Sequence, residues 1–156
     1  MSVDGTKASA DAERAVGLVQ AAIKKLGIDP EASRSERPGH VAFALRRGSA
    51  RILIAIHAPS EERSEGRLRV VAPVVKLPDA SRHLDLFRWL LQSNAAELVG
   101  AAFALSSNEV VVVSERSVTD LDASEVDAMI RNVGRVADTY DDQIAESFDA
   151  VRSSDA

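Results

Sequence analysis

The spacing of apolar residues divides the 156-residue chain into eight predicted elements. Apolar positions recur every three or four residues, the spacing of an amphipathic helix, over 9–26, 81–98 and 123–148. Short apolar runs bounded by polar or turn-forming residues, typical of strands, occupy 41–45, 51–57, 67–77, 101–105 and 109–114. The predicted order is α-β-β-β-α-β-β-α. Because the links between strands are short, neighbouring strands must pair antiparallel. The predicted fold class is therefore α+β, with helices packed on a five-stranded antiparallel sheet.

Two local signals refine these elements. Asp122 can cap the last helix, with Glu125 three residues later and Leu121 and Val126 at the positions of a hydrophobic staple. Pro73 lacks a backbone N–H, which predicts that its strand lies at a sheet edge or contains a bulge. We expect residues 29–39, with two prolines, to form a loop.

The length of the chain predicts one domain. We place it at residues 9–150, with a flexible N-terminus at 1–8 and a flexible tail at 151–156. The string Ala-Phe-Ala-Leu occurs twice, at 42–45 and 102–105, which fits either a duplicated unit or two similar inward-facing strands. We assign the large residues of both strings to the core: Phe43, Leu45, Phe103 and Leu105.

The residue types restrict the possible chemistry. The chain has no Cys, which excludes thiol catalysis, disulfides, iron–sulfur clusters and cysteine-containing zinc motifs. It also lacks a phosphate-binding glycine loop, a nucleophile elbow, an HExxH motif and an EF-hand loop. We expect capping, turn or solvent-facing roles for His40, His57 and His83. The prediction is a protein with no catalytic residue, no metal site and no cofactor, hence not an enzyme.

Charge is unevenly placed. Residues 34–76 contain nine basic and four acidic residues, whereas residues 119–156 contain ten acidic and three basic ones. A basic stretch can indicate nucleic-acid binding, but aromatic residues for base stacking are scarce here. We therefore expect solvated arginines, partly neutralised by the acidic end, and no nucleic-acid partner. The carboxylates at 138, 141, 142, 146 and 149 form a helical stripe that could hold a cation, but we expect a solvated face.

No segment approaches the ~20 apolar residues that span a membrane. The first eleven residues lack the uninterrupted apolar core of a signal peptide. We expect a cytoplasmic protein without membrane contact.

The predicted helix at 81–98 has two apolar stripes on opposite faces. Leu84, Phe87 and Leu91 form the stripe assigned to the core. The second stripe contains Leu86, Trp89, Ser93 and Ala96, and we predict that it is a self-association face of a homodimer, because Trp is enriched at interface centres. The alternative is that a loop, such as residues 29–39, covers Trp89.

Several segments of the second half resemble a known family. They are Leu90-Leu91-Gln92-Ser93-Asn94, Ala101 to Leu105, Val110 to Val113, Leu121-Asp122 and Ala137-Asp138-Thr139-Tyr140. This pattern resembles the YbjN-like family, whose members share the fold of type III secretion chaperones. The resemblance implies a five-stranded antiparallel sheet with helices and no enzymatic activity. Proteins of this fold are often homodimers, to which the second helix and its neighbouring strands contribute.

The resulting expectation is a non-enzymatic, homodimeric, chaperone-like or regulatory protein. Its unidentified partner polypeptide would lie along an exposed strand or helix surface, by groove packing or by strand addition. The alternative is a sensor of small molecules or metals, or a cryptic enzyme, on the same fold.

Overall fold

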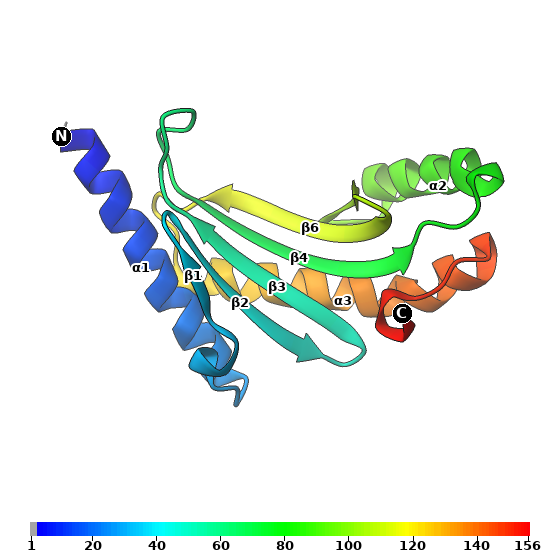
Figure 1. The fold of residues 1–156 in the computed structure, drawn as a ribbon, viewed down its shortest axis with the longest axis horizontal. Helices are drawn as coiled ribbons and strands as arrows, with labels where there is room; N and C mark the ends of the chain where they lie inside the picture. The colour runs from blue at the N-terminus through cyan, green and yellow to red at the C-terminus, as the bar shows by residue number, and fades with distance from the viewer. Residues whose placement is uncertain (1–2) are drawn as a thin grey trace. The chain divides into compact units, whose positions relative to one another are not determined.

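The computed structural model describes residues 3–156 and has the predicted order of helices and strands, with one additional strand. The helices are α1 (Val3–Lys25), α2 (His83–Ala96) and α3 (Ala123–Phe148). The strands are β1 (Ser35–Arg37), β2 (His40–Arg47), β3 (Ala50–His57), β4 (Arg67–Lys76), β5 (Ala102–Ser106) and β6 (Glu109–Ser117). Three short 3-10 turns complete the order at Pro30–Ser33, Ala80–Arg82 and Ser153–Asp155 (Figure 1).

The strands form a six-stranded sheet in the order β1-β2-β3-β4-β6-β5, so the predicted count of five is wrong. The additional strand is β1, which lies within the expected loop at 29–39. It pairs antiparallel with β2, from Ser35 opposite Ala42 to Arg37 opposite His40. All three of its residues are exposed and polar, so it lacks the apolar alternation that marks a strand in a sequence.

Of the two alternatives predicted for the strand of Pro73, a position at the sheet edge is wrong. Pro73 lies in β4, which has β3 on one side and β6 on the other. In an antiparallel ladder the N–H and C=O groups of one residue face the same neighbour, so a proline removes a single ladder bond. The remaining residues of this ten-residue strand keep it in the sheet interior.

The backbone divides into two compact units. The first unit contains Met1–Leu45, Leu53–Val70 and Glu115–Ala128, and the second contains Arg46–Ile52, Val71–Ser114 and Met129–Ala156. Each unit therefore draws on three separate stretches of sequence, and each is described by itself below.

In the first unit, α1 buries a face of small and branched residues that includes Ala15, Val19 and Ile23, all at most 1% exposed. The guanidinium of Arg14 donates a hydrogen bond to the carbonyl oxygen of Leu121, 2.8 Å away. The helix begins at Val3, so the predicted flexible segment 1–8 is helical from residue 3 onward; residues 1–2 lie outside the described part of the chain.

The predicted start of α3 is confirmed at atomic detail. The Asp122 carboxylate accepts a hydrogen bond from the Glu125 N–H at 2.9 Å, and the Glu125 carboxylate accepts one from the Asp122 N–H at 2.9 Å. Leu121 and Val126 are both fully buried, as a hydrophobic staple requires. These contacts satisfy backbone donors that the first helical turn leaves unpaired.

In the second unit, the segment predicted to be a flexible tail is paired with the end of β4. The N–H of Lys76 donates to the carbonyl oxygen of Val151 at 2.8 Å, and Val75 and Arg152 form an antiparallel bridge. The guanidinium of Arg152 lies 2.8 Å from the carboxylates of Asp142 and Asp155. Backbone pairing holds this segment at the end of β4, and the ion pair with Asp142 joins it to α3.

No described helix combines the length and apolar character that a membrane crossing requires.

Candidate protein-interaction surface

The second unit contains a helix with an uncovered apolar face, α2. The side chain of Asp79 accepts a hydrogen bond from the Ser81 N–H and begins the short turn that leads into the helix. Within the helix, Leu86, Leu90 and Ser93 are buried at 5% exposure or less. These three residues recur at helical spacing and define the inner face of α2.

An aromatic cluster fixes the position of Trp89 beside this inner face. The ring centre of Trp89 lies 5.8 Å from that of Phe103 on β5, 5.9 Å from Tyr140 and 6.1 Å from Phe148, both on α3. Inclined rings at such separations attract one another through their quadrupoles. The Tyr140 hydroxyl donates to the Glu97 carboxylate at 3.0 Å, which ties the end of α2 to α3.

A second contact joins α2 to the backbone of β5. The Asn94 amide nitrogen donates to the carbonyl oxygen of Phe103 at 3.1 Å, and the Phe103 N–H donates to the Asn94 amide oxygen at 2.7 Å. Phe103 is thus held by α2 through both its ring and its main chain.

The opposite face of α2 exposes leucines. Leu84 is 68% exposed and Leu91 is 69% exposed, and both border a shallow hollow whose other lining residues are Phe87, Arg88, Gln92 and Ala95. The prediction that Leu84 and Leu91 belong to the core is therefore wrong. Val99, just beyond the helix, is 78% exposed. Half of the six large apolar side chains that are exposed in the described chain lie on α2 or directly after it.

The residues predicted for the self-association face are distributed differently. Leu86 and Ser93 lie inside the second unit, which removes them from the surface. Trp89 is half-buried against rings of the same chain, so neither a loop at 29–39 nor a second chain is needed to cover it. Ala96 is exposed. A helical wheel cannot tell which of two apolar stripes faces inward. The contacts that Trp89 and Asn94 of α2 make with Phe103 of β5 decide it.

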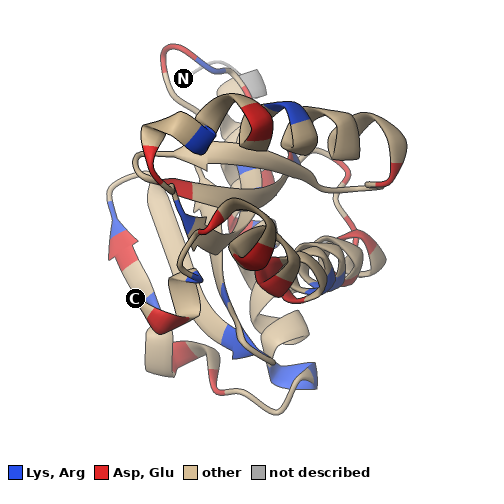
Figure 2. Cartoon of the chain, turned by 90° about the vertical axis from the view of Figure 1, so that its right-hand side faces the viewer, with Lys and Arg blue, Asp and Glu red and all other residues tan. Residues whose placement is uncertain are grey.

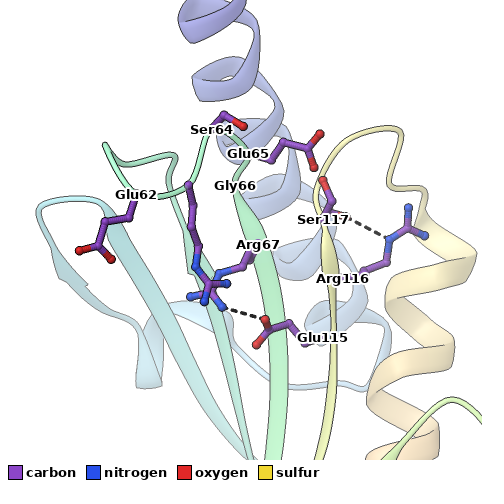
Figure 3. A pocket seen from close by; sticks show the side chains of 9 residues that line it. Glu62, Ser64, Glu65, Gly66, Arg67, Glu115, Arg116 and Ser117 are labelled. Carbon is purple, nitrogen blue, oxygen red and sulfur yellow. Dashed lines mark hydrogen bonds and ion pairs between the residues drawn. The ribbon is translucent and has the colours of Figure 1, made fainter.

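The first unit contains a charged hollow (Figure 3). It is lined by the segment before β4 and by the end of β6. Glu115 lies 2.7 Å from a guanidinium nitrogen of Arg67 and 2.6 Å from one of Arg69. Burial raises the pKa of Glu115, but its hydrogen bonds to the two arginines outweigh this and hold the pKa below its usual range. Arg116 pairs with Glu125.

These pairs correct the expected neutralisation of the basic stretch. Within the described chain, the ion-pair partners of Arg34, Arg67, Arg69 and Lys76 are glutamates at 31, 36, 109 and 115, outside the acidic last helix. Positions of both signs are interspersed on helices, strands and loops (Figure 2). The basic residues of this stretch that form ion pairs are therefore neutralised by glutamates nearby in the sequence or on the neighbouring strand.

One member of the acidic stripe on α3 departs from the expected solvated face. Asp141 is only 7% exposed, and its carboxylate and that of Asp138 both lie within hydrogen-bond distance of the Ser49 hydroxyl, at 3.0 and 2.7 Å. The Asp142 carboxylate binds Arg152. Within the described residues, no three histidines or carboxylates converge as metal ligands.

Two histidines meet across β2 and β3. The ring centres of His40 and His57 are 4.8 Å apart, and the His40 Nδ1 is buried without a hydrogen-bond partner. Burial is the main cause that lowers the pKa of His57, and electrostatic repulsion from the nearby His40 and Arg67 lowers it further. His83 lies elsewhere, with its Nε2 2.9 Å from the carbonyl oxygen of Pro78.

The comparisons with known proteins place this architecture. The family model YbjN, described as "Putative bacterial sensory transduction regulator", matches residues 16–146. The chain belongs to the YbjN family. The resemblance noted from the sequence is confirmed. Comparison with curated proteins gives no match.

Solved structures similar to the chain are complexes of type III secretion chaperones and related proteins. A chain of the ExsC–ExsE complex matches with a TM-score of 0.56 and 14% identity, covering 84% of this chain and 93% of that one. A chain of the HopA1–SchA chaperone–effector complex matches with a TM-score of 0.53 and 10% identity, covering 81% of this chain and 91% of that one. A chain of the heterodimeric ExoU–SpcU complex of Pseudomonas aeruginosa matches with a TM-score of 0.53 and 15% identity, covering 77% of this chain and 92% of that one. The YbjN chain therefore has the fold of type III secretion chaperones.

Truncating the two faces of α2 tests their assignment. Leu86→Ala is expected to lower the free energy of unfolding by about 2–5 kcal/mol, because it empties a fully buried site. Leu84→Ala removes the same atoms from an exposed site and should change the stability by less than about 0.5 kcal/mol. Urea unfolding at submicromolar protein concentration measures both. Equal losses would contradict the assignment of the two faces.

The lowered pKa of His57 predicts a stability that falls on acidification. The unfolded chain binds a proton near the usual histidine pKa of about 6.5, whereas the folded chain resists it, so stability is lost as pH falls through this value. Urea midpoints measured from pH 8 to 5 should decline, and His57→Gln should flatten the decline above pH 5. An unchanged slope in the variant would show that other groups cause it.

Proposed function

We propose that this YbjN-family protein is a non-enzymatic protein-binding module that acts as a homodimer with a chaperone-like or regulatory role. The observation that carries the proposal is the uncovered apolar face of α2, where Leu84 and Leu91 are both more than two-thirds exposed. Contiguous exposed apolar surface marks interaction sites more often than isolated residues do.

Self-association through this face suits its pattern of side-chain sizes. If two copies of α2 pair antiparallel about a two-fold axis near the helix centre, Leu84 of one copy lies opposite Ala95 of the other. A large residue then faces a small one at both ends of the contact, which allows the helices to approach closely. The fourteen-residue helix is about 21 Å long, so the dimer would also need contacts beyond the helix, and the exposed Val99 is a candidate.

A partner polypeptide is supported by the kind of structure that shares this fold. Similar solved chains come from a chaperone–effector complex and from a heterodimeric complex of a secretion system. The family description, a sensory transduction regulator, also fits a protein that acts by binding another protein. We therefore propose partner binding as the task of the chain, with the partner lying on an exposed helix or strand surface.

Charge introduced on the exposed face tests the homodimer. Leu91→Glu is expected to convert the dimer to a monomer at tens of micromolar protein, because a carboxylate would be buried against a second copy. The fold should survive, since Leu91 is 69% exposed. Sedimentation velocity measures the change. Leu26→Glu, at an exposed leucine that follows α1, is the matched control and should leave the association state unchanged.

Partner binding is tested by capture from the native host. The wild-type chain is expected to recover one protein in stoichiometric amount, and the purified pair should then bind in titration calorimetry. Saturable binding of a metabolite or metal instead, seen as a thermal shift of several degrees, would favour a sensor.

A wild-type sample that is monomeric at tens of micromolar contradicts the homodimer.

A further inference from the structure

The outer edge of β5 is protected in an unusual way. β5 is the last strand of the sheet and pairs on one side with β6, from Ala102 opposite Val113 to Ser106 opposite Glu109. An edge strand presents unpaired N–H and C=O groups that can recruit another strand. The sequence Ala-Ala-Phe-Ala-Leu-Ser at 101–106 has no charge and no proline, the composition of a strand that pairs readily with copies of itself.

Asn94 occupies the middle of this edge. Its amide oxygen accepts from the Phe103 N–H at 2.7 Å, and its amide nitrogen donates to the Phe103 carbonyl at 3.1 Å. A carboxamide carries the same donor and acceptor as a peptide group. The side chain therefore gives Phe103 the two hydrogen bonds that a neighbouring strand would give.

The antiparallel ladder limits what remains of the edge. Both backbone groups of a residue in such a ladder face the same side, and successive residues alternate. Because those of Phe103 face Asn94, Ala102 and Ala104 face β6, and Leu105 is the next residue that faces outward. β5 ends one residue later, at Ser106, and the turn begins at Ser107 with a φ of 52°. With Phe103 occupied, an incoming strand can bond with Leu105 alone within β5.

We infer that Asn94 closes the β5 edge and thereby prevents strand addition by β5 of a second copy of this chain. The ring contact between Trp89 and Phe103 keeps α2 against the strand and holds the amide in place. The inference goes beyond the proposed function, because it concerns the inner face of α2 and not the face that carries Leu84 and Leu91. It also assigns a role to a residue at which the sequence pattern indicates only a polar helix position.

The test replaces Asn94 with alanine in the Leu91→Glu background, where helix-mediated association is already removed. Alanine has a higher helix propensity than asparagine, so the substitution does not weaken α2 itself. Amide hydrogen exchange of Phe103 is expected to accelerate about tenfold or more, because its N–H loses its partner. Sedimentation velocity at high protein concentration should show new self-association. A further Leu105→Lys substitution should suppress it, since an edge lysine opposes strand pairing.

Gln92→Ala is the matched control, because it removes an exposed amide two residues earlier on the same helix. It should leave the exchange of Phe103 unchanged, and near-ultraviolet dichroism of Trp89 reports whether the fold is kept. Unchanged protection of Phe103 in Asn94→Ala overturns the inference. The inference is also overturned if the Phe103 amide exchanges faster in Asn94→Ala but the chain stays monomeric at millimolar concentration. If Leu91→Glu alone does not alter the association state, association through the exposed face of α2 fails, while the comparison of Asn94→Ala with its parent still tests the inference.

Discussion

The attachment of α2 to Phe103 decides which surface the second unit presents. The ring of Phe103 packs against Trp89 and Tyr140, and its backbone bonds to Asn94. These contacts fix the rotation of α2 about its axis, because Trp89 and Asn94 both contact the same residue of β5. Once the rotation is fixed, Leu86 and Leu90 are inside and Leu84 and Leu91 outside. Every proposal about association depends on this choice.

The sequence predicts elements well where local signals agree. The start of α3 has an N-cap, a reciprocal carboxylate and a hydrophobic staple, and all of these act within a few residues. The order of helices and strands follows from periodicity in the same way. β1 could not be predicted, because its pairing with β2 depends on backbone geometry and leaves no apolar pattern in three exposed residues.

The candidate site was harder to predict than the fold, for a physical reason. The two stripes of α2 have similar apolar content, so hydrophobicity cannot choose between them. The choice comes from partners distant in sequence, such as Tyr140, which lies outside any local window. Leu105 illustrates the same limit: it repeats the pattern of Leu45, yet it is 50% exposed whereas Leu45 is buried. Position at the sheet edge explains the difference.

The two units alternate along the sequence, which limits how recombination can exchange them between genes. Each unit is assembled from three separated stretches of sequence, and the hydrogen bond from Arg14 to Leu121 joins residues 107 positions apart within one of them. A single cut or a single recombination point cannot separate one unit from the other, because at least one of the two resulting fragments always contains stretches of both units. The two units must therefore be exchanged between genes together, and an insertion is tolerated best in an exposed turn.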